Sequence, residues 1–331
     1  INPIYLRQMN QDFAATGGIF DRSRGNNFYP RDLTVDEWNT YLREHPEQKE
    51  QLLNPFSVVE RQGRDLIVIP YSVLSREEVQ AIAEQLEAAA DLVSHESFRN
   101  FLRGRANAFR TDSYVESDRE WVQCVGAPFE LILGPFEIYE DSLLGIRRDF
   151  EGTLGIVLTE QQKKVEQYQE WAAAFDGLLG RNFGYTPFYT PTRMVVIDEI
   201  ATGGGTLYGF TAMAANLPDD EETRRTVGTK KTFMYNAIVE KFRYLTAPIA
   251  ERVLTMALDP KIFFQFIVGH ELSHGLRFRF EGKDFGPLAS PLEEAKADVF
   301  GVLFLYWLVE RRILMPETAH EAAAICIADS L

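Results

Sequence analysis

Near the carboxyl end of the chain, five residues have the types and spacing of a metal site. His270 and His274 lie four positions apart, so on a helix both imidazoles leave the same face about one turn apart. Glu271 then lies beside the metal, in the position of the general base of the motif His-Glu-x-x-His. Glu294 and Asp298 supply a third ligand and a carboxylate that can accept a proton from a ligand imidazole. Two histidines and one carboxylate suit zinc better than magnesium or calcium.

Two predicted helices position these residues. Asp259 followed by Pro260 is a favourable helix start, and the mostly apolar stretch from Ile262 to Leu276 continues as a buried helix. A second helix begins at Ser290, which forms a capping box with Glu293. The ligands are therefore expected on two helices joined by a loop.

Each of these residues also has a simpler explanation. Two histidines at helical spacing can be a chance pattern, Glu293 can be only a cap, and Glu294 with Asp298 can belong to a solvated helix face. The apolar run before the histidines argues against a surface position, because buried histidines without a partner are costly. We therefore favour the metal site.

Length and composition bound the class of protein. With 331 residues and 45% hydrophobic residues, the chain can build two domains or one large unit around a real core. A net charge of −15 argues against nucleic acid or an anionic membrane surface as partner. Cys124 and Cys326 are the only cysteines, which excludes a disulfide framework and a cysteine metal site.

Neither a membrane span nor a targeting segment is visible in the sequence. The longest apolar run, Val299 to Val309, is too short to cross a bilayer and is expected to form a buried helix. The chain begins at Ile1 rather than Met, so we expect a processed form whose targeting segment lies outside this sequence. We expect a cytoplasmic location, and the sequence leaves the oligomeric state open.

The remaining elements mix helices and strands without the alternation of a parallel α/β protein, which favours an α+β fold. Ser57 to Arg61 and Leu66 to Tyr71 are predicted to form a hairpin, and Arg76 begins a long helix that runs toward Arg105. The helix from Thr159 to Gly180 carries an apolar stripe typical of a core. Arg193 to Ile200 is predicted to be a strand.

Three loop regions have weaker signals. A strand from Phe129 to Phe136 is followed by Glu137 and Tyr139, a plausible cleft edge, although a solvated turn is the favoured explanation from sequence alone. The glycines at 203–205 lack the spacing of a phosphate loop and are expected to form a backbone turn. The basic stretch 224–231 is expected to be solvated.

Taken with these elements, the chain resembles the dipeptidyl peptidase III family, peptidase family M49. It resembles the variant with the five-residue motif that some bacterial and Nudix-linked relatives carry. The matching residues are Phe28, Tyr29 and Pro30; Pro55 to Val59 with Pro70 and Tyr71; Gly134 to Asp141; Asn216 to Asp219; His270 to Gly275; and Glu293 to Asp298. Several separated motifs in one order are more specific than any one of them, and together they cover most of the chain.

The resemblance implies a fold, an activity and a cofactor. The fold is α+β, with two lobes around a wide cleft. A lobe with a β core comprises residues 1–157 and 199–241, and a mostly helical zinc-binding lobe comprises residues 158–198 and 242–331. The activity is release of dipeptides from the amino terminus of a peptide substrate. One zinc ion per chain is held by His270, His274 and Glu294.

The resemblance also implies roles for further residues. Glu271 activates the attacking water, and Tyr139 stabilises the tetrahedral intermediate. Glu137 and Asn216 hold the free amino group of the substrate. Asp219, which follows Pro218, is a further residue implied to bind the substrate amine. Glu293 and Asp298 are implied to be carboxylates just outside the ligand set.

The chain departs from the family pattern in three places. The motif lacks one residue between the histidines, and Asp219 stands where the family typically has Asn. The sequence ends 33 residues after Asp298, whereas the family continues to a further catalytic His and to an Arg that binds the peptide carboxylate. His320 does not match that His.

These departures keep a second function open. The alternative is a peptide-binding or scaffold domain of the same fold, with a structural or vestigial zinc site. Structural zinc is usually closed by four protein ligands, and the three ligands expected here favour catalysis.

Overall fold

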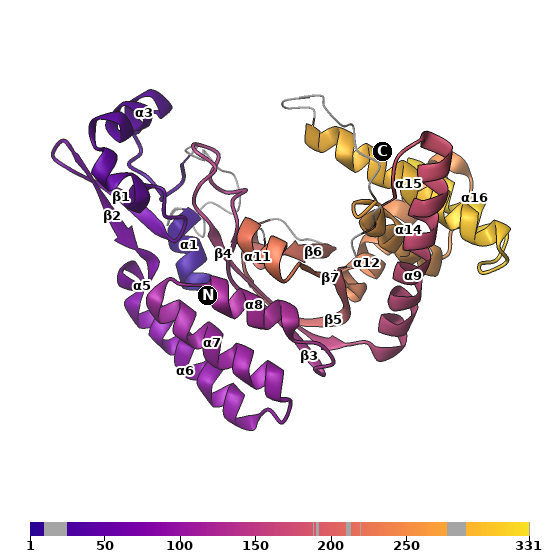
Figure 1. The fold of residues 1–331 in the computed structure, drawn as a ribbon, viewed down its shortest axis with the longest axis horizontal. Helices are drawn as coiled ribbons and strands as arrows, with labels where there is room; N and C mark the ends of the chain where they lie inside the picture. The colour runs from indigo at the N-terminus through magenta and orange to yellow at the C-terminus, as the bar shows by residue number, and fades with distance from the viewer. Residues whose placement is uncertain are drawn as a thin grey trace. The chain divides into compact units, whose positions relative to one another are not determined.

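The computed structural model describes residues 1–9, 25–187, 189, 192–209, 213–218, 220–276 and 289–330, shown in Figure 1. The chain divides into two compact units. Unit 1 comprises residues 1–156, 199–212 and 216–229, and unit 2 comprises residues 157–198, 213–215 and 230–331. The lobe boundaries given above stay a prediction. In this division, residues 230–241 group with unit 2.

Unit 1 contains a small hairpin and a set of helices. Its elements are α1 (Asn2–Met9), α3 (Val35–Glu44), η1 (Pro46–Gln48), α4 (Lys49–Leu52), β1 (Ser57–Gln62), β2 (Asp65–Pro70), α5 (Tyr71–Leu74), α6 (Arg76–Leu92), α7 (Glu96–Thr111), α8 (Val115–Gln123), β3 (Phe129–Glu137), β4 (Asp149–Val157), α10 (Gly205–Tyr208) and α11 (Glu221–Thr226). The predicted hairpin is confirmed, because β1 and β2 pair antiparallel with Gln62 opposite Asp65. Gly63 makes the turn at a φ of +65°.

The single long helix predicted from Arg76 is wrong. Helix α6 ends at Leu92, and α7 starts again at Glu96 and lies side by side with α6 (Figure 1). The break arises because Val93 takes an extended conformation and the ring of His95 accepts a hydrogen bond from the backbone of Phe98, which caps the new helix. A cap on the second helix therefore outweighed the favourable helix composition.

The larger sheet of the protein is mixed, with both antiparallel and parallel strands. Among the described residues it has five strands in the order β3-β4-β5-β7-β6, where β5 is Arg193–Gly204, β6 is Ala214–Leu217 and β7 is Lys230–Met234. Strands β3 and β4 are antiparallel, whereas β5 and β7 are parallel, with Arg193 opposite Lys230. A mixed sheet combined with many helices confirms the α+β class.

Strand β7 contradicts part of the solvated basic stretch expected from the sequence, because Lys230 and Lys231 are buried, whereas Arg224 and Arg225 are exposed as expected. All five of its residues are buried, and Lys231 is only 3% exposed. The strand is fixed by its parallel pairing with β5, which places Lys231 opposite Met194. Two consecutive lysines in a strand point to opposite faces, so burial of both means that both faces of this strand are covered.

Unit 2 is mostly helical and has one apolar core. Its further elements are α9 (Thr159–Phe183), α12 (Tyr235–Lys241), the π-helical segments η2 (Phe242–Thr246) and η3 (Ala250–Leu254), α13 (Ala247–Ile249), α14 (Pro260–Ser273), α15 (Ala289–Glu310) and α16 (Glu317–Asp329). The apolar stripe predicted on α9 is confirmed as core: Val165 and Phe175 are buried in one cluster with Phe263 of α14 and Leu305 of α15. This core holds the two helices that carry the metal motif.

The two helices predicted around the metal motif are confirmed. The carboxylate of Asp259 accepts a hydrogen bond from the backbone of Lys261 at 2.8 Å, with Pro260 at the first helical position of α14. Helix α15 begins at Ala289, one residue before the predicted start, and the side chain of Ser290 in the predicted capping box lies outside the described residues.

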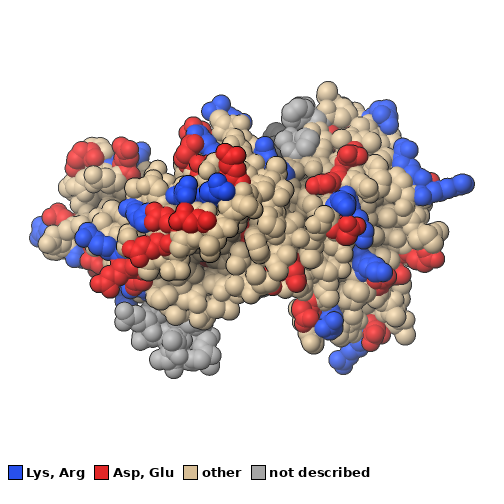
Figure 2. All heavy atoms as spheres, turned by 90° about the horizontal axis from the view of Figure 1, so that it is seen from below, with Lys and Arg blue, Asp and Glu red and all other residues tan. Residues whose placement is uncertain are grey.

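The apolar run of α15 is buried on one side only, and it is not a membrane span. Within that run Leu305 and Leu308 are buried, whereas Val299 is 55% exposed, so the buried helix is confirmed on one face only. No helix in the described part of the chain is long and apolar enough to cross a membrane. On the face shown in Figure 2, acidic and basic side chains are interspersed.

The glycine run at 203–205 generates a stability prediction. Gly204 has a φ of +60°, and a Cβ atom there would overlap the backbone carbonyl oxygen of Phe150. Gly204→Ala should therefore destabilise the protein by more than about 3 kcal/mol, because the backbone cannot shift without breaking the sheet. The measurement is the unfolding temperature. Gly63→Ala is the control, because Gly63 has a similar φ but nothing within 4 Å, and an equal loss in both variants would contradict the steric argument.

Candidate functional site

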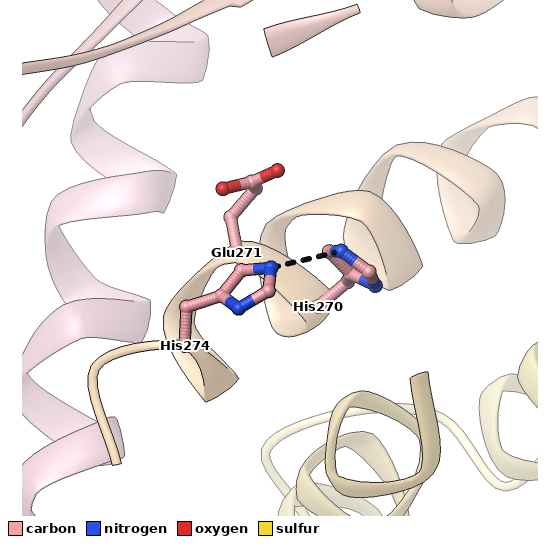
Figure 3. A group of neighbouring side chains, drawn as sticks. All are labelled: His270, Glu271 and His274. Atoms are coloured by element: carbon pink, nitrogen blue, oxygen red, sulfur yellow. Dashed lines mark hydrogen bonds between the residues drawn. The ribbon is translucent and has the colours of Figure 1, made fainter. Parts of the chain in front are cut away.

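The two motif histidines meet at the end of α14. Their Nε2 atoms are 3.2 Å apart, and Figure 3 shows a ring nitrogen of each imidazole pointing toward the other, with the Glu271 carboxylate to one side. Zinc binds histidine nitrogen at about 2.0–2.1 Å, so two ligands of a tetrahedral ion lie about 3.3–3.4 Å apart. Although α14 ends at Ser273, His274 keeps helical dihedral angles, which preserves the four-residue spacing. The imidazoles are thus already at the separation of two ligands of one ion.

A carboxylate on α15 completes a triangle of donor atoms. Glu294 Oε2 lies 3.3 Å from His270 Nε2 and 3.8 Å from His274 Nε2. Two nitrogens and one oxygen at these separations fit a zinc-like ion. The Glu294 side chain is 57% exposed, so it can adjust by a few tenths of an ångström. The structure therefore brings together the residues predicted as ligands.

Each histidine is oriented by a second carboxylate from α15. Asp298 Oδ1 lies 2.8 Å from His270 Nδ1, and Glu293 Oε1 lies 3.1 Å from His274 Nδ1. A carboxylate that accepts the Nδ1 proton fixes the tautomer and leaves the lone pair on Nε2, the atom that points into the triangle. Lys296 in turn donates to Glu293 Oε1 at 2.5 Å, with only 2% of the lysine side chain exposed.

These contacts shift the pKa values of the histidines in opposite directions. Burial lowers the pKa of His270, but the hydrogen bond to Asp298 and the charges of Glu271 and Glu294 outweigh burial and raise it. Burial also lowers the pKa of His274, and the charge of Lys231 adds to that effect. The surroundings of the two imidazoles therefore favour the proton on His270 more than on His274.

Glu271 has a different partner from the other carboxylates. Lys231 Nζ on β7 donates to Glu271 Oε2 at 2.7 Å and to the Glu271 backbone oxygen at 2.6 Å. Burial raises the pKa of the Glu271 carboxyl, but the charge of Lys231 and its hydrogen bond outweigh burial and hold the pKa below its usual range. Glu271 is therefore an ionised carboxylate beside the two imidazoles.

The charges of the site fit a divalent cation. Among the described residues, this cluster contains the carboxylates of Glu271, Glu293, Glu294 and Asp298 and the ammonium groups of Lys231 and Lys296. With both imidazoles neutral the formal charge of this cluster is −2, four carboxylates against two ammonium groups. A divalent ion at the triangle would balance that charge. The residues present therefore fit a metal in number, donor type and charge.

Close packing of α14 and α15 brings the carboxylates to the histidines. Gly269 and Gly301 face each other across the two helices: a Cβ at Gly301 would lie 2.9 Å from the backbone nitrogen of His270 and 3.2 Å from the Gly269 carbonyl carbon. Only glycine permits this approach, because every neighbouring atom is backbone. The reach of the α15 carboxylates therefore depends on two residues without side chains.

The substrate-binding residues implied by the resemblance lie in unit 1, whereas the residues above lie in unit 2. Glu137 is the last residue of β3, and Tyr139 follows it with 71% of its surface exposed. Asn216 is an exposed residue of β6, and Asp219 lies outside the described residues. The roles of these residues stay predictions.

The loop that carries Tyr139 has a rigid base. Asp141 accepts hydrogen bonds from the backbone nitrogens of Ile146 and Arg147 at 2.8 and 2.9 Å and from the Tyr29 hydroxyl at 2.7 Å. Such an inward-facing carboxylate holds the loop in one conformation while its tip stays exposed. The structure has a turn here with an exposed Tyr139, as favoured from the sequence alone, and these hydrogen bonds tie its base.

Two residues of the site escaped the sequence analysis. Lys296 stands three residues after Glu293, a spacing that would have predicted a pair on one helix face. Lys231 is 40 residues from Glu271 in the chain, and its local sequence predicted only a solvated cation. The run from Thr232 to Met234 could have predicted a strand, but not its neighbour across the fold.

The contact between Gly269 and Gly301 predicts what happens to zinc affinity and stability when α14 and α15 are pushed apart. Gly301→Ala should weaken zinc binding at least about tenfold and lower the unfolding temperature, because the methyl group would push the α15 carboxylates away from the imidazoles. Zinc affinity by competition with a chelator is the measurement. Leu303→Ala, an exposed position of the same helix, is the control. Unchanged zinc affinity in Gly301→Ala would show that the close approach is dispensable.

The pKa of His270 predicts the pH dependence of metal binding. A metal ion must displace the proton from His270, whose pKa is raised above its usual range by the hydrogen bond to Asp298 and the nearby carboxylates, so zinc affinity should fall on acidification. Removing the Asp298 charge with Asp298→Asn should move this edge to lower pH, whatever its effect on the absolute affinity. Zinc titrations between pH 5 and pH 8, roughly the range in which histidine titrates, measure both edges. An edge at the same pH in both proteins would contradict the assignment.

Comparisons with known proteins agree with this geometry. The model of peptidase family M49 matches residues 48–276, more than half of the chain. A curated relative, Nudix hydrolase 3 of Arabidopsis thaliana, is 27% identical over 326 residues, which cover 88% of this chain and 42% of the relative. The chain thus spans less than half the length of that relative.

Two solved structures share the fold. The structure of DPP III from Caldithrix abyssi has a TM-score of 0.90 and 28% identity, and the match covers 99% of this chain and 72% of that one. The structure of dipeptidyl-peptidase III from Corallococcus sp. strain EGB has a TM-score of 0.78 and 24% identity, with 99% and 71% covered. The second likeness supports the fold alone. The family model matches a range that includes His270, Glu271 and His274 of the site. This chain therefore belongs to peptidase family M49.

Proposed function

We propose that this chain is a zinc-dependent peptidase that releases dipeptides from the amino terminus of peptides. The observation that carries the proposal is the triangle of His270 Nε2, His274 Nε2 and Glu294 Oε2 with an ionised carboxylate, Glu271, beside it. Membership of peptidase family M49 and the likeness to a structure named DPP III support the substrate class.

Within this proposal, one zinc ion is held by His270, His274 and Glu294. Asp298 and Glu293 orient the two imidazoles through their Nδ1 atoms. When bound, such an ion supplies a Lewis acid for the scissile carbonyl and lowers the pKa of water. Every other part of the chemistry falls to side chains.

Glu271 carries the proton transfers. Its carboxylate takes a proton from the water that attacks the peptide carbonyl, and it gives that proton to the leaving nitrogen as the C–N bond breaks. A depressed pKa keeps Glu271 ionised and ready to accept. The phenol of Tyr139 donates a hydrogen bond to the oxyanion of the tetrahedral intermediate.

Recognition of the free amino terminus sets the product length. The carboxylate of Glu137 and the amide of Asn216 bind the substrate ammonium group, and Asp219, further along the chain, adds a negative charge. Holding the amino terminus at a fixed distance from the reacting carbonyl selects one peptide bond, which in this proposal is the second. A blocked amino terminus would lose this binding.

The rival function is a peptide-binding domain with a closed, structural metal site. One observation bears on it: donor atoms of His270, Glu271 and His274 all lie within 4.8 Å of one another, so these three could hold a metal ion. With Glu294 they would make four protein ligands, the number of a structural site. We favour catalysis because Glu271 is already paired with Lys231.

Peptide hydrolysis by the wild-type chain and by Glu271→Gln tests the proposal. Free amino-terminal peptides of four to eight residues should yield dipeptides with the wild type, and the substitution should lower the rate about 10²–10⁴-fold while zinc stays bound, because only the proton acceptor is lost. Mass spectrometry of the products gives the dipeptides, and metal analysis gives the zinc content.

Two controls sharpen this test. Glu170→Gln changes an exposed glutamate on α9 and should keep full activity. Amino-terminally acetylated peptides should resist cleavage by all proteins. If the zinc-loaded wild type and Glu271→Gln are equally inactive, the binding-domain function replaces this proposal.

A further inference from the structure

In the contacts described above, the residues around the two histidines come from α14 and α15, except for Lys231, which comes from strand β7 of the sheet. Its side chain is only 4% exposed, and its Nζ atom makes two hydrogen bonds to the same residue, one to the Glu271 carboxylate and one to the Glu271 backbone oxygen. Parallel pairing of β7 with β5 fixes the backbone of Lys231. The ammonium group therefore has a defined position and little freedom to leave Glu271.

Glu271 has two competing partners. Its carboxylate is within 4.8 Å of the donor atoms of His270 and His274, and donors of one tetrahedral zinc ion lie about 3.4 Å apart. A small rotation of the side chain would therefore take the carboxylate from Lys231 to a metal ion. A divalent cation attracts a carboxylate strongly, so something must hold Glu271 back if it is to act as a base.

We propose that Lys231 decides the role of Glu271: by holding the carboxylate, it keeps Glu271 from becoming a fourth protein ligand of the metal. The part of this inference that makes Glu271 the base rests on the function proposed above. The part that concerns metal coordination does not, because it predicts a change in metal binding whether or not peptides are cleaved.

Burial makes the pairing hard to break. A buried ammonium group has lost its hydration, and without an ion pair nothing offsets that cost. Breaking the ion pair between Lys231 and Glu271 is therefore unfavourable. The second hydrogen bond, to the Glu271 backbone oxygen, keeps the ammonium group at the end of α14 even when the side chain moves. Lys231 is accordingly a positioning residue, and its contact is with the base rather than with the substrate.

The replacement Lys231→Met tests the inference, because methionine fills a similar volume without charge. Zinc should bind about tenfold more tightly or better, since Glu271 is released to the metal and a full ligand is gained. The visible spectrum of the cobalt-loaded protein should change with the added ligand. Peptide hydrolysis, if the wild type shows it, should fall about 10²-fold or more with the base withdrawn.

Two further variants assign the effect to the carboxylate. In Lys231→Met combined with Glu271→Gln, zinc affinity and cobalt spectrum should match those of Glu271→Gln alone, because the amide replaces the competing ligand. Lys241→Met is the matched control: it also removes a lysine paired with a carboxylate in unit 2, here Asp329 at 2.8 Å, and should leave zinc affinity unchanged. If Lys231→Met does not fold, Lys231→Gln gives the same comparison with a polar side chain.

The outcomes separate the inference from the proposed function. Equal or weaker zinc binding in the folded Lys231 variant overturns the inference, since a residue that only stabilises the fold would weaken the site. Tighter zinc binding that disappears in the double variant supports it. A wild-type chain that binds zinc but cleaves no peptide overturns the proposed function, and the zinc and cobalt measurements still decide the role of Lys231.

Discussion

The contact between Gly269 of α14 and Gly301 of α15 is the constraint on which the metal region depends. Backbone touches backbone there, so the two helices approach more closely than any pair of side chains would allow. Within about two turns of this contact, α14 presents two imidazoles and α15 presents three carboxylates. The apolar core of unit 2 keeps both helices in register, and small errors in that register would separate donors that now lie 3.2–3.8 Å apart.

Electrostatic pairing gives each carboxylate of the region a separate task. Asp298 and Glu293 are held on the outer nitrogens of the histidines, Glu294 faces their inner nitrogens, and Glu271 is held by Lys231. Buried charges are costly unless paired, so burying Lys231 and Lys296 forces specific partners on them. Four chemically similar carboxylates are thereby held at separate positions around the two imidazoles.

Unit 1 anchors an exposed loop in a different way. Tyr139 is exposed, but the loop that carries it is anchored by the buried carboxylate of Asp141, which gathers backbone nitrogens and the Tyr29 hydroxyl. Behind it, the buried guanidinium of Arg147 donates to the backbone of Leu52. Exposed side chains on such a base are positioned without being covered, which suits the role proposed for Tyr139.

Local patterns in the sequence determined a large part of this protein. The helix start at Asp259, the histidine spacing, the hairpin around Gly63 and the apolar stripe of α9 are all short-range signals, and the structure has each of them. The break between α6 and α7 was missed because a histidine cap competed with a strongly helical composition. Even there the signal was local, although it was weak.

Contacts between distant segments needed the tertiary structure. Lys231 resembled a solvated cation because nothing in its neighbourhood reveals that both faces of β7 are covered or that Glu271 lies beside it. The Gly269 and Gly301 contact was equally hidden, since a glycine inside a helix has no local purpose. The sequence by itself determined which side chains are available for metal chemistry and on which helices they stand. Only the tertiary structure decided which carboxylate serves which nitrogen, because those choices depend on helix approach and buried charge rather than on spacing along the chain.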